Sequence, residues 1–199
     1  MSQRFHFITH PNVEIRRDVA VPRWPLSALG RERMQAGLAQ PWVRTVDAVF
    51  ASTEQKAIDG AQILAEHLGL PVQSLEELGE NDRSATGFLE PEEFERVADA
   101  FFAQPHDAVR GWERAIDAQA RILRAVEQVA QVAGAHRHIA IVAHGAVGAL
   151  LWCQLAGMPI SRRWDQPPGG GGHYFEFTLQ PRRAMHAWLR FDDLAKSLP

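Results

Sequence analysis

The sequence predicts an α/β fold, a three-layer sandwich with a mostly parallel central sheet, helices on both faces and an antiparallel edge strand. Short apolar runs with strand character alternate along the chain with segments that carry apolar residues at helical spacing. Such alternation favours a parallel sheet covered by helices. Two more strand-like runs follow each other near the C-terminus and would add the antiparallel edge. The 199 residues suffice for one domain with a sizeable core.

The first part of the chain predicts three strands separated by two helices. Residues 3–9 alternate in polarity and end just before Pro11, as a short buried strand does. Ser27 is a suitable N-cap for one helix, and Ser52 with Gln55 has the spacing of a capping box before another. We expect strands over 3–9, 46–52 and 70–75, a loop over 11–26, and helices over 28–39 and from the Ser52 cap to Gly69.

The middle of the chain, residues 76–110, is acidic and irregular. We expect one short helix within it, at 91–103. The segment is interpreted as a lid-like insertion in a single domain that spans residues 1–199.

The remaining residues predict a long helix, a central strand, a shorter helix and a late strand pair. An amphipathic helix over 111–134 would bury a stripe made of Trp112, Ile116, Ala120, Leu123, Val126 and Ala130. The apolar run "HIAIVAHG" is typical of a strand buried on both faces. We expect this strand at 138–145, a helix at 146–156, a flexible "PPGGGG" loop at 167–172, and late strands at 173–179 and 184–191 around a turn at Pro181.

Composition and charge exclude several classes of function. The formal net charge is −3 and the pI about 6.3, so no basic field is available to hold nucleic acid or an anionic membrane. Cys153 is the only cysteine, which excludes an internal disulfide and suits a reducing compartment. Residues 1–9 lack a signal-peptide core, and no apolar run approaches the roughly 18 residues of a membrane span. We therefore expect a cytoplasmic protein.

Two histidines stand where two predicted strands end. His10 ends the first strand and His144 the fourth, and ligands of open α/β sheets bind beyond these carboxyl ends. Gly145 leads from His144 into a helix whose N-terminus would face the same crevice, and Lys56 lies in the first turn of another helix. Together these groups predict a pocket for a phosphate-like dianion. Within it an imidazole could bind the anion or attack it.

Two other interpretations compete with this one. A single histidine at a strand end is more often structural, but two on separate strands favour function. Nine histidines also raise the question of a metal, yet His136 and His138 flank the opposite end of their strand, and no H-E-x-x-H or Cys/His cluster is present. We therefore predict no metal and no other cofactor.

The order of these motifs resembles the histidine phosphatase superfamily, the phosphoglycerate mutase-like proteins. "ITHPN" is similar to the family's strand ending in Arg-His-Gly, which places His10 at the nucleophile, with Thr9 at the arginine and Asn12 in the same turn. "IAIVAHGAVG" closely resembles the family's second histidine strand and puts His144 on the second catalytic histidine. Thr9, Asn12 and Gly145 are then candidate phosphate ligands.

Three further elements follow in the family's order. "ASTEQKA" resembles Ser-Pro-x-x-Arg-Ala, with Lys56 at the arginine. From "LPV" the spacing reaches "LGE", which makes Glu80 the preferred match to the family's catalytic acid and leaves Glu77 in reserve. The family's opening of the long helix is echoed by Gly111, Glu113, Asp117 and Arg121.

The resemblance implies metal-independent hydrolysis of a phosphomonoester. His10 would become a phosphohistidine, Glu80 would act first as acid and then as base, and His144 with Lys56 would hold the phosphoryl oxygens. The implied substrate is a small phosphorylated metabolite or a phosphoprotein.

Thr9 and Lys56 depart from the family's two arginines, and each change removes a bidentate grip on phosphate. Three explanations stay open. Arg83, or Arg16 and Arg17, could restore the lost charge; the substrate could be less charged; or turnover could be lost, leaving a phosphate-ligand-binding relative. A mutase-type phosphotransferase is a further alternative. The sequence specifies neither the substrate nor the oligomeric state.

Overall fold

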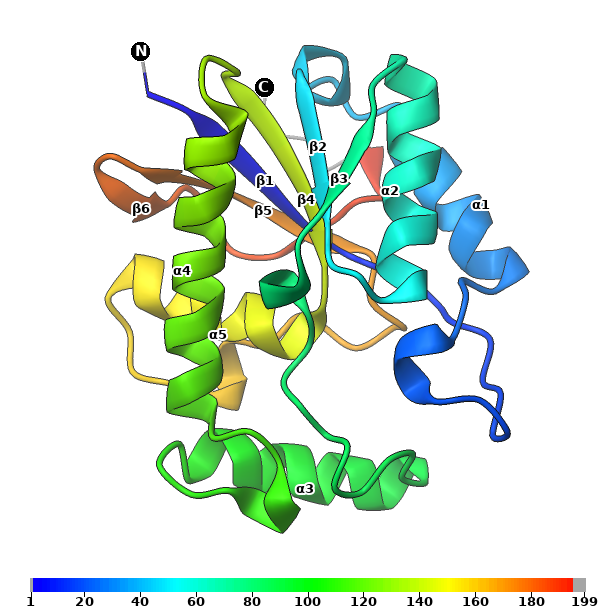
Figure 1. The fold of residues 1–199 in the computed structure, drawn as a ribbon, viewed down its shortest axis with the longest axis vertical. Coiled ribbons are helices and arrows are strands. Elements are labelled where there is room, and N and C mark those ends of the chain that lie inside the picture. The colour runs from blue at the N-terminus through cyan, green and yellow to red at the C-terminus, as the bar shows by residue number, and fades with distance from the viewer. Residues whose placement is uncertain (1, 195–199) are drawn as a thin grey trace.

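A computed structural model describes residues 2–194, and across these residues it contains a seven-stranded sheet with helices on both faces (Figure 1). The strand order is β3-β2-β4-β1-β5-β6, and β7 also pairs with β5. The strands are β1 Arg4–Thr9, β2 Ala48–Ala51, β3 Val72–Ser74, β4 His138–Ala143, β5 His173–Leu179, β6 Arg182–Ala184 and β7 Leu189–Arg190. The pairs among β1, β2, β3 and β4 are parallel, whereas β5 runs antiparallel to β1, β6 and β7. The predicted fold class is confirmed.

The helices form the two outer layers and a separate lobe. They are α1 Ala28–Gly37, α2 Gln55–Leu68, α3 Pro91–Ala103, α4 Ala115–Ala133 and α5 Gly145–Ala156. Short 3-10 turns lie at η1 Val21–Arg23, η2 Val43–Thr45, η3 Glu76–Leu78, η4 Val109–Gly111 and η5 Arg162–Trp164. Helices α1 and α2 cover one face of the sheet, and α4 and α5 cover the other. Helix α3 lies beyond the end of the sheet and packs on Trp112 and α5 (Figure 1).

The central strands are mostly apolar because both sheet faces are covered. On β1, Phe5 and Phe7 point into the core with α4 and α5, and Ile8 points into the core with α1 and α2. The same alternation places Ile141 of β4 in the first core and Val142 in the second. Two packed layers thus hold β1 and β4 side by side, so that the two strands end at the same edge of the sheet.

The long helix begins later than the pattern predicts, and its buried stripe matches the predicted one only in part, at Val126. Its N-cap is Arg114, and Trp112 is extended and packs in the α3 lobe. A stripe counted from Trp112 is therefore rotated, and Ala120 on that stripe is exposed. The buried residues of α4 are Ala115, Ala118, Gln119, Ile122, Ala125, Val126, Val129 and Ala133.

Two other local predictions are wrong. Helix α2 is capped at Glu54, not through a Ser52–Gln55 box, because the Ser52 hydroxyl accepts from the Glu54 N–H and the Gln55 side chain donates to Asp59. The strand expected at 184–191 is broken into β6 and β7. Between them the His186 carbonyl accepts from the indole N–H of Trp152, and its imidazole from the Glu176 N–H, so this stretch leaves the ladder.

The glycine-rich loop at 167–172 is not loose but held by Arg33. The buried Arg33 guanidinium donates to the carbonyls of Gly169 and Gly171 at 2.9 and 2.7 Å, to Asn12 Oδ1 and to Asp192 Oδ2. Gly171 has φ +74°, and a Cβ there would lie 2.2 Å from the His10 carbonyl oxygen. Only glycine permits this approach, so the loop packs directly against the backbone of His10.

Arg33→Ala should destabilise the protein by about 3 kcal/mol, since removing one partner of a buried pair leaves Asp192 and the loop carbonyls unsatisfied. Urea unfolding measures this loss. Arg16→Ala provides the matched control, because Arg16 forms an exposed pair with Glu14 and its removal should cost less than about 1 kcal/mol. Equal losses in the two variants would show that Arg33 does not organise the loop.

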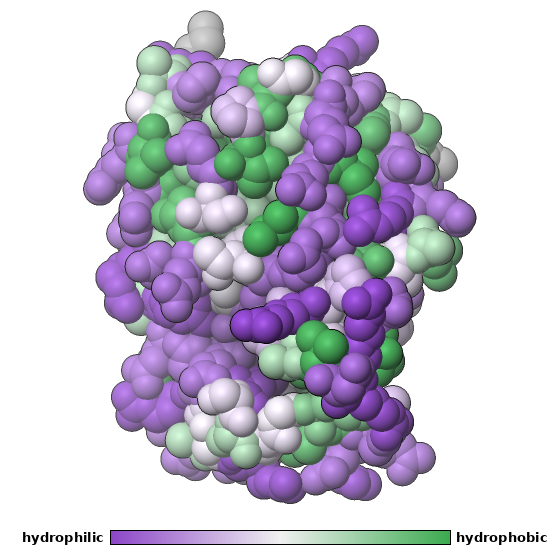
Figure 2. Space-filling model, turned by 45° about the vertical axis from the view of Figure 1, so that its right-hand side comes forward, coloured by the Kyte–Doolittle hydropathy of each residue, from purple (hydrophilic) through white to green (hydrophobic). Residues whose placement is uncertain are grey.

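Hydrophobic residues on the face shown in Figure 2 are interspersed with hydrophilic ones. Within residues 2–194, none of the helices combines the length and the apolar character that crossing a membrane requires.

Candidate active site

His10 and His144 meet at the carboxyl ends of two neighbouring parallel strands. Thr9 pairs with Ala143 at the last register position of β1 and β4, so the next residue of each strand leaves the sheet at the same place. The His10 N–H donates to the Ala143 carbonyl at 3.0 Å. The two ring centroids lie 5.2 Å apart at an interplanar angle of 69°. The predicted convergence of the histidines is therefore observed.

One nitrogen of the His10 ring is engaged and the other is available. Nδ1 lies 3.0 Å from the Pro11 carbonyl oxygen, which can only accept, so Nδ1 carries the proton and Nε2 holds a lone pair. No side chain of residues 2–194 forms a hydrogen bond with Nε2. Burial and the charge of Lys56 lower the pKa of His10 to about 4. At neutral pH this ring is uncharged, and its Nε2 lone pair could act as a nucleophile.

His144 is fully buried and faces two oxygens. Its Nε2 lies 2.6 Å from Ser52 Oγ and 3.3 Å from Glu54 Oε1. Burial lowers the pKa of His144 to about 3, although the Glu54 charge opposes the shift. The second imidazole is therefore also neutral at pH 7.

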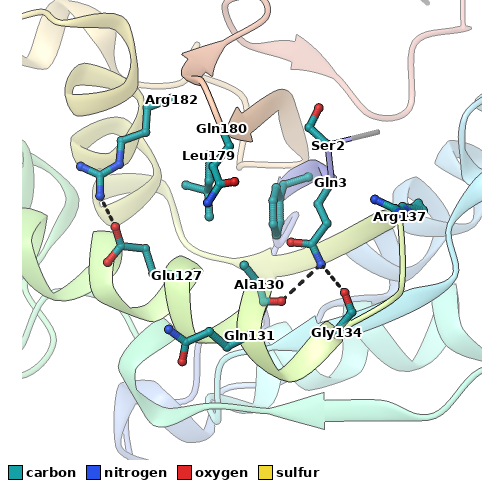
Figure 3. A pocket seen from close by; sticks show the side chains of 11 residues that line it. Ser2, Gln3, Glu127, Ala130, Gln131, Gly134, Arg137, Leu179, Gln180 and Arg182 are labelled. Atoms are coloured by element: carbon teal, nitrogen blue, oxygen red, sulfur yellow. Dashed lines mark hydrogen bonds and ion pairs between the residues drawn. The ribbon is translucent and has the colours of Figure 1, made fainter.

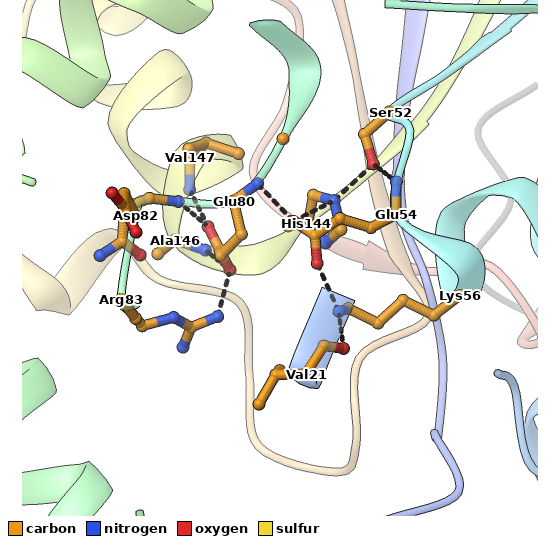
Figure 4. A network of polar contacts seen from close by, with 12 residues as sticks. Val21, Ser52, Glu54, Lys56, Glu80, Asp82, Arg83, His144, Ala146 and Val147 are labelled. Atoms are coloured by element: carbon orange, nitrogen blue, oxygen red, sulfur yellow. Dashed lines mark hydrogen bonds and ion pairs between the residues drawn. The ribbon is translucent and has the colours of Figure 1, made fainter. Parts of the chain in front are cut away.

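Glu54 lies at the centre of the site, and the sequence analysis missed it. Its carboxylate accepts from Lys56 Nζ at 2.5 Å and from the Glu80 N–H at 2.9 Å, and it faces His144 (Figure 4). Burial opposes its ionisation, but His144, Lys56 and the Glu80 N–H together lower the pKa of Glu54 to about 2. Because His144 is uncharged at pH 7, Lys56 is the cation that balances Glu54 there. The position of Glu54 in the turn before α2, two residues from Lys56, was the sequence signal that could have identified it.

The Glu80 side chain lies against the N-terminus of α5, the helix that begins directly after His144. Its carboxylate accepts from the N–H groups of Ala146 and Val147 at 3.3 and 3.1 Å (Figure 4). The reserve candidate Glu77 is exposed on η3. Arg121 donates to the backbone carbonyls at 77, 79 and 80 and pairs with Glu113, so it holds the whole turn.

Arg83 is the additional cation that reaches the site. Its guanidinium lies 3.6 Å from Glu80 Oε2 and stacks over Phe94 and Trp112, and its charge contributes to the low pKa of His10. The other two candidates are engaged elsewhere. Arg16 pairs with Glu14, and Arg17 pairs with Glu90 at the edge of the α3 lobe.

The remaining candidates hold the backbone around His10. Thr9 is fully buried, and its hydroxyl donates to Gln166 Oε1 at 2.6 Å and accepts from the His173 N–H. An arginine there would displace Gln166. The Asn12 side chain accepts from Arg33, not from a group of the histidine pair. Gly145 opens α5, and a Cβ on it would lie 2.4 Å from Gln166 Nε2, so Gln166 reaches the helix N-terminus; no sequence signal pointed to Gln166.

A separate cavity of about 530 Å³ lies at the opposite end of β1 (Figure 3). Its lining includes Gln3, Glu127, Gln131, Arg137 and Arg182 and contains no histidine. The Gln3 amide donates to the carbonyls of Ala130 and Gly134 there. This cavity is therefore distinct from the histidine pair.

The comparisons with known proteins agree with this geometry. The family model of the histidine phosphatase superfamily, branch 1, matches residues 7–183. The chain belongs to the histidine phosphatase superfamily. No curated protein matches it by sequence.

Several solved structures share the histidine phosphatase fold. A mycobacterial glucosyl-3-phosphoglycerate phosphatase is 21% identical with a TM-score of 0.77, over 95% of this chain and 99% of its own. Bacillus stearothermophilus YhfR is 24% identical with a TM-score of 0.76, over 94% and 95%. A putative alpha-ribazole-5'-P phosphatase from Escherichia coli is 19% identical with a TM-score of 0.72, over the full length of both chains. At these identities the likeness establishes the fold.

Proposed function

We propose that this histidine phosphatase superfamily member hydrolyses phosphomonoesters through a phosphohistidine on His10. The observation that carries the proposal is the neutral His10 ring, whose Nδ1 is fixed on Pro11 and whose Nε2 is available beside His144. An imidazole oriented in this way has a lone pair to offer and no competing proton.

In the first step His10 Nε2 attacks phosphorus while the bond to the ester oxygen breaks. Glu80 donates its proton to that oxygen, so the alcohol leaves neutral. Lys56, Arg83 and the α5 N-terminus stabilise the charge on the transferring oxygens.

In the second step water attacks the phosphohistidine. The Glu80 carboxylate takes a proton from this water, the phosphorus–nitrogen bond breaks, and phosphate leaves with His10 restored. Residues 76–110 contribute Glu80 and Arg83 to the site, which supports the view of this segment as a lid-like part of one domain. The phosphatases that share the fold are named for small phosphorylated substrates, and a small metabolite is accordingly the favoured substrate class.

The intermediate itself is the test. After brief exposure to an aryl phosphate at neutral pH, mass spectrometry should find one phosphoryl group on His10 of the wild type and none on His10→Ala. Glu80→Gln should accumulate more of it, because an aryl leaving group needs little protonation whereas the second step loses its base. Absence of the adduct from both the wild type and Glu80→Gln would contradict the proposal.

A phosphate-ligand-binding relative without turnover is the second candidate. It is favoured by Thr9 and Lys56 at the positions of the family's arginines and by the two carboxylates on the site's donors. Binding of phosphate without any adduct on His10 would decide for it. A phosphohistidine that persists until a second alcohol accepts the phosphoryl group would instead indicate a mutase-type phosphotransferase.

A further inference from the structure

The donors that would hold a phosphoryl group are already occupied by carboxylates of the chain. Glu54 takes the Lys56 ammonium and the Glu80 N–H and faces His144, and Glu80 takes two N–H groups of α5 (Figure 4). Of these two carboxylates, only that of Glu80 takes part in the proposed chemistry. The position of Glu54 therefore needs its own explanation.

The charges around His10 cancel. Lys56 is paired with Glu54 at 2.5 Å and Arg83 lies 3.6 Å from Glu80, while both imidazoles are neutral at pH 7. Before any ligand binds, the two cations and the carboxylates of Glu54 and Glu80 leave no net positive charge among these four groups. A phosphate dianion entering beside Lys56 would also meet the Glu54 carboxylate at close range, and buried like charges repel strongly.

Glu54 is held as a ligand would be held. Its side chain is only 13% exposed, and its oxygens contact an ammonium, a backbone N–H and an imidazole nitrogen. These are the groups that bind phosphate oxygens in proteins. The Lys56 side chain is 4% exposed and donates a second hydrogen bond to the Val21 carbonyl, so its ammonium has little freedom to turn away from Glu54.

We propose that Glu54 is an internal anion that occupies the phosphate subsite and determines specificity, so that a phosphoryl group binds only by displacing it. Free phosphate, which brings no other contacts, is then bound weakly, and productive substrates need an organic part whose binding drives the displacement. The inference rests on the proposed phosphatase function and adds a selection against small dianions.

The test is the affinity for inorganic phosphate, measured by isothermal titration calorimetry on the full chain. Glu54→Gln keeps the shape of the side chain and removes its charge, and it should bind phosphate about tenfold more tightly or better than the wild type. Glu90→Gln makes the same change of net charge at an exposed ion pair and should leave the affinity unchanged. Glu54→Ala, which removes the carboxylate without adding a polar group, should tighten binding as well and serves if the glutamine variant does not fold.

The opposite result has a clear meaning. If Glu54 instead positions Lys56 and His144 for phosphate, both Glu54 variants will bind phosphate more weakly, and the proposal is overturned. Unchanged affinity overturns it too. If the wild type forms the His10 adduct but Glu54→Gln binds phosphate no more tightly, the role of Glu54 as an internal anion is rejected and the phosphatase proposal stands. Absence of the adduct together with absence of phosphate binding in every variant would reject the phosphatase proposal with it.

Discussion

His10→Ala should hydrolyse an aryl phosphate about 10³-fold more slowly than the wild type, or worse, because loss of a covalent nucleophile removes the whole two-step route. The structure makes this a sharp expectation, since the other imidazole in the site is fully buried and its Nε2 is engaged by Ser52 and Glu54. Initial rates at saturating and at low substrate would separate the effect on kcat from that on kcat/KM. Both should fall.

The matched control for this variant is His67→Ala. His67 is exposed in the last turn of α2, away from the carboxyl ends of the strands, and its removal should leave the rate unchanged. Equal rates for wild type and His10→Ala would assign the hydrolysis to another group or to a contaminant.

The free energy of unfolding should fall steeply as the pH drops from about 6.5 to 4. Four histidines, three buried and one (His10) half-buried, have a lowered pKa in the folded protein, chiefly through desolvation; for His6 and His144 the value is about 3, and for His10 and His173 about 4. In the unfolded chain such rings titrate near 6.5. Between these values the unfolded state binds more protons, so acid favours unfolding.

Carboxyl groups with shifted pKa values modify this slope. Burial raises the pKa of Asp165 to about 6, so in the same range the folded state gains one proton and about three remain as the difference, four less one. Three protons correspond to roughly 4 kcal/mol per pH unit near pH 5. The low pKa of Glu54 acts at a lower pH, because its stabilisation is lost only as the pH falls from about 4.5 toward 2.

Urea unfolding at a series of pH values between 4.5 and 7 measures the proton difference directly. His6→Phe should reduce it by one, since the His6 ring stacks on Trp42 with centroids 4.0 Å apart and phenylalanine can keep that stack without titrating. His67→Phe should leave the slope unchanged. A wild-type slope near zero would show that these rings protonate without unfolding the protein.

Much of the site was predictable because it depends on strand ends. His10 and His144 each follow an apolar run, and parallel neighbours bring the ends of such runs to one edge of a sheet. The place of Lys56 in the first turn of α2 carried the same kind of local information, whereas Glu80 was implied only by the resemblance to the histidine phosphatase superfamily. The structure brings all four together.

Other predictions failed where distant contacts overrode local pattern. The capping box at Ser52 was wrong because the Ser52 hydroxyl, which accepts from the Glu54 N–H, also faces His144, 92 residues away in the chain. The glycine-rich loop was expected to be flexible, yet Arg33 of α1 binds its carbonyls. Trp112 was placed on the long helix but packs in the α3 lobe instead.

The sequence by itself determined the layered α/β fold and the meeting of two imidazoles, because strand periodicity and the parallel order of strands are local or nearly local properties. The tertiary structure alone decided the charge of the site. In the folded protein Arg83 lies beside Glu80, whereas Arg16 and Arg17 pair with other carboxylates. Thr9 bonds to Gln166, and the Glu54 carboxylate pairs with Lys56. The physical reason is that the energy of a buried charge depends on the distance and desolvation of its partners, and these partners come from segments that only folding brings together.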